Sequence, residues 1–160
     1  MSKDVSAPLE TKLVIRGFGR ALLTDAKTGK VIADKEFTNV VTDVGIRDFI
    51  VKSIHSDLSG TVIGYSGVGS NTTAPATDDT ALGSEFETRK ANVGALVASR
   101  TLRNTWSYAT NEATQSSVGE VGLFRTDTGA PMFNHATFTQ SLKTTNQTLA
   151  FTYDVVFATA

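Results

Sequence analysis

The stretch Gln147-Thr-Leu-Ala-Phe-Thr-Tyr-Asp-Val-Val-Phe-Ala158 has the clearest strand pattern in the chain, and it decides the fold class. Its apolar side chains alternate with polar or small ones, which is typical of a β-strand with one face on a core. Strands of this kind are most common in antiparallel sheets. The side chains that share the apolar face are Leu149, Phe151, Tyr153, Val155 and Phe157.

Further segments of strand length precede this stretch, and turns rich in Gly, Asn, Asp or Pro separate them. The first two flank the polar loop 25–30, where Gly29 occupies the place of a left-handed turn residue, and they predict a β-hairpin. Many strands at short spacing predict a mainly β fold, either an antiparallel β-sandwich or a barrel-like, jelly-roll-like sheet. The expected strands are residues 13–23, 31–37, 61–66, 93–99, 101–109, 118–125, 132–139 and 147–158.

One segment has a helical period instead. Thr42 or Asp43 is placed to cap its N-terminus, and it ends at residues 57–60. We expect a single amphipathic α-helix that packs on one face of the sheet. Its apolar side chains recur at spacings of three and four residues, and they are Ile46, Phe49, Ile50 and Ile54.

The chain has 160 residues, which is most simply one domain. Residues 1–10 are polar and contain Pro8, so we expect an N-terminal arm, either a free end or a strap onto a neighbour. Residues 11–160 form a single β-rich domain in this interpretation, because neither a linker nor an internal repeat divides them.

Composition and charge argue against several classes of function. A net charge of −1 gives no general attraction to nucleic acid or to an anionic membrane, so neither is an expected partner. The absence of cysteine removes disulfides, thiol catalysis and Cys-ligated zinc. No apolar run approaches the roughly 20 residues of a membrane helix, and the first residues lack a signal-peptide core. We expect the protein to fold in a cytoplasm, or to leave it by a route without such a signal.

Residues 63–90 form a long polar segment between the two strand-rich parts of the chain. A loop of this length inside a compact domain usually has a function or contacts a partner. Its start, Gly64-Tyr-Ser-Gly-Val-Gly-Ser70, is similar to a phosphate cradle, but neither a long helix nor a Gly-Lys-Ser/Thr sequence follows. We interpret these glycines as residues that permit tight backbone turns.

Acidic residues in the same loop suggest a calcium site, but their spacing differs from the twelve-residue loop of an EF-hand. We interpret Asp78 or Asp79 as the cap of a turn at residues 80–82. Glu85 is then expected to form an ion pair with Arg89 or Lys90. We therefore expect no metal and no cofactor.

The remaining candidates for chemistry are the two histidines and one aromatic strand. His55 and His135 have no neighbouring Ser, Asp or second His in a recognisable catalytic arrangement, so we expect a non-enzymatic protein. Trp106 and Tyr108 lie in the segment that contains Arg100 and Arg103, which suits stacking on sugar rings or single-stranded nucleic acid. We favour burial in the core for the two rings, and solvent or an interface for the arginines.

Several short motifs occur in a defined order between about residues 13 and 158. The segment Asn39-Val-Val-Thr-Asp-Val-Gly45 opens the helix. The other motifs are Gly67-Val-Gly-Ser-Asn-Thr-Thr-Ala-Pro75, Asp79-Thr-Ala-Leu-Gly-Ser-Glu85 with Arg89, Val118-Gly-Glu-Val-Gly-Leu-Phe124, Asp127-Thr-Gly129, Phe138, Lys143 and the last strand. In this order the motifs resemble a family of small β-rich structural proteins of tailed-bacteriophage virions, which usually has Asn at the position of Asp43.

The resemblance implies a structural component of the virion, assembled in the cytoplasm of the bacterial host. We expect a capsid decoration or cement protein that binds other virion proteins, such as the major capsid protein, and forms a trimer or another homo-oligomer. One alternative is an accessory protein of the tail, neck or baseplate, or the attachment domain of a fibre. Another is a carbohydrate-binding module, which requires Trp106 and Tyr108 to be exposed.

The expected contacts with subunits or partners lie in the arm, residues 2–9, and in the loop, residues 67–82 and beyond. The individual residues are Ser2, Lys3, Pro8, Gly67, Gly69, Asn71, Pro75, Asp79, Leu82 and Arg89.

Overall fold

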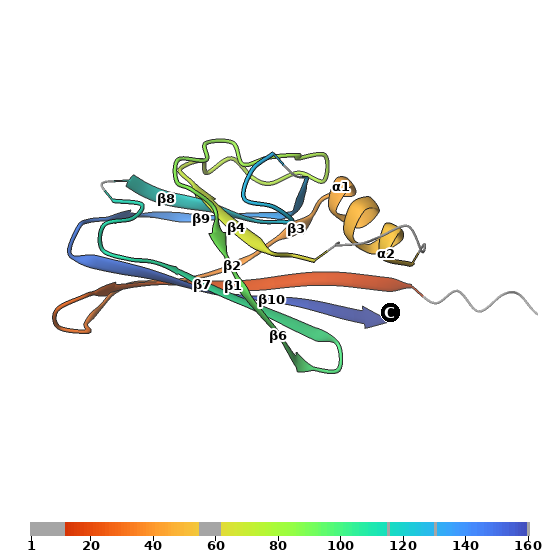
Figure 1. Ribbon diagram of the computed structural model, residues 1–160, viewed down its shortest axis with the longest axis horizontal. Helices are drawn as coiled ribbons and strands as arrows, with labels where there is room; N and C mark the ends of the chain where they lie inside the picture. Colours follow the sequence, from red (N-terminus) through yellow and green to blue (C-terminus); the bar gives the residue numbers. More distant parts are fainter. Residues whose placement is uncertain (1–11, 55–61, 115, 130, 160) are drawn as a thin grey trace, which may run out of the picture.

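The structure, a computed structural model, describes residues 12–54, 62–114, 116–129 and 131–159. Two antiparallel sheets of five strands pack face to face, which confirms the predicted β-sandwich (Figure 1). Sheet A has the order β2 (Val31–Thr38), β1 (Leu13–Asp25), β10 (Gln147–Thr159), β7 (Thr101–Tyr108) and β6 (Val93–Ala98). Sheet B has the order β3 (Val40–Val41), β9 (Met132–Lys143), β8 (Ser116–Phe124), β4 (Tyr65–Gly69) and β5 (Lys90–Ala91).

The alternating strand β10 lies at the centre of sheet A, between β1 and β7. Its odd-numbered side chains face sheet B, as the sequence predicts, and Phe151 is stacked on Trp106 with 4.8 Å between ring centroids. Trp106 and Tyr108 are both buried in this core, which confirms the core interpretation. The platform of exposed rings that the carbohydrate-binding alternative requires from these two residues is therefore not on the surface.

The predicted hairpin joins β1 and β2, and its turn has the expected chemistry. Gly29 has a φ of 71°, in the left-handed region that glycine tolerates best. The Asp25 carboxylate accepts hydrogen bonds from the backbone N–H groups of Lys27 and Thr28. This side chain replaces the missing backbone partners inside the turn.

The helical segment lies at one end of the sandwich and consists of α1 (Asp43–Gly45), η1 (Ile46–Val51) and α2 (Lys52–Ile54) (Figure 1). Thr42 caps it as predicted, because its hydroxyl accepts a hydrogen bond from the Gly45 N–H at 2.9 Å. Phe49 is buried against Phe133 of β9, with ring centroids 5.3 Å apart. The middle of the segment is π-helical, which a regular 3.6-residue period does not anticipate.

Two strands differ most from the sequence predictions, and the short strands β3 and β5 are not among the expected ones. The expected strand 61–66 starts later, at Tyr65, and continues through Gly67 and Gly69, which had been assigned to the loop. Strand β9 extends to Lys143, four residues beyond the predicted end at residue 139. In both strands the partner β8 continues the ladder, so pairing across the sheet outweighs the weak strand propensity of glycine and small polar residues.

Candidate functional site

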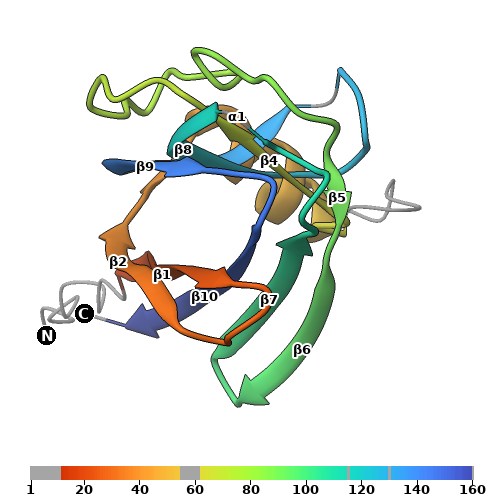
Figure 2. The ribbon, with the colours of Figure 1, turned by 90° about the vertical axis from the view of Figure 1, so that its left-hand side faces the viewer.

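The long polar segment crosses the outer face of sheet B as a loop, residues 70–89, between β4 and β5. Figure 2 shows it above β4 and β8, on the side away from sheet A. Leu82 anchors the loop in a small apolar cluster with Phe124 and Met132, where all three side chains are buried. The loop is therefore part of the packed domain and has its own core.

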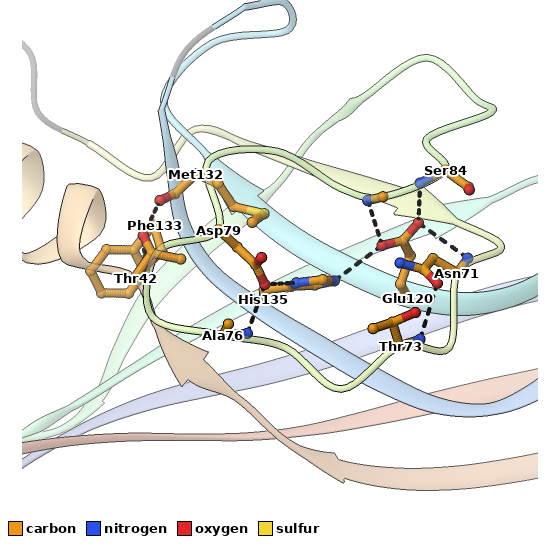
Figure 3. A network of polar contacts seen from close by, with 11 residues as sticks. Thr42, Asn71, Thr73, Ala76, Asp79, Ser84, Glu120, Met132, Phe133 and His135 are labelled. Atoms are coloured by element: carbon orange, nitrogen blue, oxygen red, sulfur yellow. Dashed lines mark hydrogen bonds and ion pairs between the residues drawn. The ribbon is translucent and has the colours of Figure 1, made fainter.

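A buried carboxylate holds the two arms of this loop together (Figure 3). Glu120 of β8 has no exposed surface. One of its oxygens accepts hydrogen bonds from the backbone N–H groups of Asn71, at 3.2 Å, and Ser84, at 2.7 Å. The other accepts one from the Gly83 N–H at 3.0 Å. One side chain thus fixes backbone positions on the two arms of the loop.

His135 of β9 joins Glu120 to the far side of the loop. Its Nε2 lies 3.0 Å from a Glu120 carboxylate oxygen, and its Nδ1 lies 2.7 Å from a carboxylate oxygen of Asp79 (Figure 3). Asp79 also accepts a hydrogen bond from the backbone N–H of Ala76 at 2.8 Å. We call Glu120, His135 and Asp79 the clamp. It connects sheet B to the loop at Asn71, Ala76, Asp79, Gly83 and Ser84.

The electrostatics of the clamp favour an imidazolium between two carboxylates. Burial lowers the pKa of His135, but hydrogen bonds and charge interactions with Glu120 and Asp79 outweigh it, and the net pKa is raised. Burial raises the pKa of Glu120 and Asp79, but the His135 ring and the backbone N–H groups outweigh it, and the net pKa of both is lowered. All three shifts favour the charged forms, in which each ring N–H of His135 donates a hydrogen bond to a carboxylate.

Two glycines allow the backbone to approach this buried charge. A Cβ atom at Gly69 would lie 2.2 Å from a Glu120 carboxylate oxygen and 2.5 Å from the Ser84 carbonyl oxygen. A Cβ atom at Gly83 would lie 2.1 Å from the Asn71 side-chain amide. Side chains larger than hydrogen therefore cannot be accommodated at either position unless the clamp or the loop shifts. These glycines serve close packing around a protein carboxylate, and the phosphate cradle considered from the sequence does not form, because Tyr65–Gly69 is a β-strand.

A second polar cluster holds the exit of the loop. Arg89 lies over the Phe124 ring, 3.4 Å from its centroid, and forms an ion pair with Glu85, as the sequence predicts. Lys90 forms an ion pair with Glu112 in the segment between β7 and β8. Glu87 accepts a hydrogen bond from the backbone N–H of Ala113 in the same segment. Both ends of the loop are therefore tied to the domain.

The structure places the predicted contact residues in different environments. Ser2, Lys3 and Pro8 lie outside the described residues. Gly67 and Gly69 are buried in β4, and Leu82 is buried under the loop. The Arg89 side chain is 7% exposed, and Asn71, Pro75 and Asp79 are half-buried. The surface that the loop presents consists instead of small side chains, among them Thr72, Thr73, Thr77, Asp78 and Thr80.

The sequence did not indicate Glu120 as a site residue. It also did not indicate that His135 contacts Glu120 and Asp79. His135 was expected to be structural, and its position between two carboxylates agrees with that interpretation. The sequence predicts Asp78 or Asp79 as the cap of a turn at residues 80–82. The Asp79 carboxylate instead accepts a hydrogen bond from the Ala76 N–H and binds His135. One signal was present in the sequence, because Glu120 interrupts the apolar strand Val118–Phe124.

The clamp satisfies its own polar atoms and is closed to solvent at Glu120 and His135, so its geometry suits a structural role. Among the described residues, no group of three or more His, Cys, Asp or Glu is arranged to hold a metal ion. Within the same residues, none of the helices has the length and apolar character to cross a membrane. Comparison with known proteins found no matching family model, curated protein or solved structure.

The clamp predicts a defined dependence of stability on pH. Because the folded-state pKa of His135 is raised, its contribution is complete below the ordinary value of 6.5 and is lost as pH rises through the folded pKa. The folded-state pKa values of Glu120 and Asp79 are lowered. Their contribution to stability is therefore complete above the ordinary pKa values of 4.5 and 3.8, and it is lost as pH falls through the folded-state values. We expect the free energy of unfolding to be greatest between about pH 4.5 and 6.5, measured by urea denaturation.

The variant His135→Gln provides the control for this pH dependence. It removes the titrating ring, so the difference in unfolding free energy between wild type and variant should shrink as pH rises above 6.5. A difference that stays constant from pH 5 to pH 9 would show that His135 is not charged in the folded protein.

Proposed function

We propose that the protein is a non-enzymatic structural component of a bacteriophage virion, most simply a capsid decoration protein. The observation that carries the proposal is a long polar loop held in one shape by a buried clamp. A loop that is already ordered loses little conformational entropy when a partner binds. The order of the motifs, described above, supports the assignment to a virion.

The chemistry of the loop surface supports adhesion to another protein. Its exposed side chains are mostly Thr and Ala, which have few rotamers to lose. The Thr hydroxyl groups and the Asp78 carboxylate are available to a partner. Glu120 and His135 are shielded from that surface. In this proposal the loop binds a virion protein, and the N-terminal arm adds a second attachment point that raises the effective concentration of the first.

The location can be tested by immunogold electron microscopy of virions purified from cells that make this protein. Label on the heads supports the decoration protein. Label on the tail, neck or baseplate supports the alternative of a tail accessory protein or fibre domain. Virions without label refute both forms of the proposal.

A charge change in the loop tests whether this surface makes the contact. We expect Asp78→Lys to lower the number of copies per virion about tenfold, corresponding to about 1.4 kcal/mol of binding free energy, because it alters the charge at an exposed loop position. The matched control is Lys27→Glu, an exposed charge change in the turn between β1 and β2. Copy numbers are measured by quantitative gel densitometry of purified virions. Equal losses in the two variants, or none in Asp78→Lys, would contradict the assignment.

A second candidate function, attachment to a polysaccharide, is favoured by a groove on the protein. The groove has a volume of about 860 Å³, and its lining includes Phe18, Arg20, Arg103 and Asp154. Phe18 is 50% exposed, and both arginines are held by ion pairs with carboxylates. An aromatic face flanked by oriented polar groups suits a sugar ring. Label at the tip of the tail in the microscopy experiment would favour this candidate.

A further inference from the structure

Strand β6 is a sheet edge with an unusual surface. Figure 2 shows it at the outer edge of sheet A, and its pairing in the structure is with β7 on one side. All six of its residues, Val93-Gly-Ala-Leu-Val-Ala98, are exposed. The exposed fractions reach 70% at Val93 and 74% at Leu96. The strand contains neither a charged residue nor a proline.

The other sheet edges are protected in ways that β6 is not. The opposite edge of sheet A, β2, carries the charged run Asp34-Lys35-Glu36. In sheet B, the edge strands β3 and β5 have only two residues each. Charged or very short edges are the usual devices that prevent pairing with another chain. Strand β6 has neither of these two devices, although a β-bulge between Leu96 and Ala98 interrupts its pairing with β7.

An unpaired edge of this composition has a physical cost in water. Half of its backbone N–H and C=O groups point away from β7, and its apolar side chains project on both faces of the sheet. Uncharged, proline-free strands of about six residues are strongly disposed to pair with other strands. A second strand paired at this edge would satisfy its free backbone groups and remove apolar side chains from water.

We propose that β6 pairs antiparallel with β6 of a second copy of this chain about a two-fold axis, so that two five-stranded sheets become one. The inference rests on the proposed function only in that a virion component has copies of itself nearby. Two-fold contacts are the commonest form of self-association. This contact predicts a homodimer, whereas the resemblance implies a trimer or another homo-oligomer.

The sequence of β6 fits itself in one register. A two-fold axis perpendicular to the sheet at Ala95 places Ala95 of one chain opposite Ala95 of the other. Side chains that lie on one face of the sheet in the first chain then lie on the same face in the second. Leu96 then lies opposite Gly94, which has no side chain and leaves room for it. The contact uses the regular part of the strand, residues 93–96, because Val97 is the extra residue of the β-bulge between Leu96 and Ala98. Because no charged residue lies in the strand, no like charges meet across the contact.

Two substitutions at the two edges of sheet A test the interface. Leu96→Lys places a charge at the centre of the contact, whereas Ile32→Lys places one on β2, where Ile32 is 49% exposed. By sedimentation velocity at neutral pH, we expect twice the chain mass of 17.0 kDa for wild type and Ile32→Lys, and a single chain mass for Leu96→Lys. A monomeric wild type, a dimeric Leu96→Lys, or equal dissociation of both variants would overturn the proposal.

A disulfide tests the register, because the chain has no cysteine of its own. Residues directly opposite in an antiparallel pair have Cα atoms about 4.5–5.5 Å apart, within the range that a disulfide spans. Under mild oxidation Ala95→Cys should form a covalent dimer on non-reducing gels, and Glu36→Cys on β2 should remain monomeric. No crosslink at Ala95→Cys, or equal crosslinking at both positions, would overturn the register.

The outcomes also separate this inference from the proposed function. A dimer that requires β6, found for a protein that labels no virion, refutes the virion assignment and keeps the interface. Labelled virions together with a protein that stays monomeric in solution refute the interface alone. Far-ultraviolet circular dichroism of each variant confirms that it is folded; Leu96 is largely exposed in the single chain, so its replacement leaves the core intact.

Discussion

Replacing Glu120 with Gln is expected to lower the free energy of unfolding by about 3–5 kcal/mol, the range typical for breaking a buried charge pair. The amide has the same shape, but it removes the negative charge that faces the His135 ring. One of the two oxygens also becomes an NH₂ group. This hydrogen-bond donor would then face groups that also donate, such as the Gly83 N–H and the His135 ring N–H. The measurement is urea denaturation followed by the fluorescence of Trp106, at pH 6.

The control for this prediction is Glu36→Gln, which makes the same change at an exposed position of β2. Surface substitutions of this kind usually alter stability by less than about 0.5 kcal/mol. A second comparison uses His135→Gln alone and together with Glu120→Gln. If the clamp acts as one unit, the double variant is less destabilised than the sum of the two single variants. Full additivity, or a loss below about 1 kcal/mol for Glu120→Gln, would contradict the role assigned to the clamp.

The variant Phe49→Ala is expected to cost about 3–5 kcal/mol of unfolding free energy, because it leaves a cavity where the helical segment meets β9. Phe49 is 7% exposed and packs edge-to-face on Phe133. Alanine keeps helix propensity high, so the change tests packing rather than the helix itself. The loss is measured from chemical denaturation curves with a shared slope.

Val51→Ala is the matched control, because Val51 belongs to the same π-helical turn and is 55% exposed. We expect its effect to stay within about 0.5 kcal/mol. If Phe49→Ala changed stability as little as Val51→Ala, the helical segment would not be packed against β9. A separate fall in the slope of the denaturation curve would indicate that the segment unfolds before the sheets do.

Much of the sandwich was predictable because its strands alternate with a period of two. In β10 the inward side chains are those that the alternation indicates, and Gly29 marked the hairpin turn correctly. Thr42 was also a correct cap. Prediction was poorer for the helical face. A π-helical turn advances by more residues than an α-helical one, so Ile46, assigned to the apolar face, is 40% exposed.

The clamp could not be derived from sequence, because its residues come together only through sheet register and loop path. Glu120 and His135 lie on neighbouring strands, and their contact depends on the β-bulge between Val118 and Glu120. Asp79 reaches His135 only because the loop folds back over sheet B. The usable signal was Glu120 itself, since a carboxylate in an apolar strand requires a partner.

The longest ladder of the sandwich joins the first strand to the last. All thirteen residues of β1 pair with β10, from Leu13 opposite Thr159 to Asp25 opposite Gln147. During synthesis, β1 therefore leaves the ribosome long before its central partner exists, and only β2 is available to it. Pairing between such distant segments is slow, so the sandwich closes after translation of β10, and the nascent chain exposes apolar strands until then.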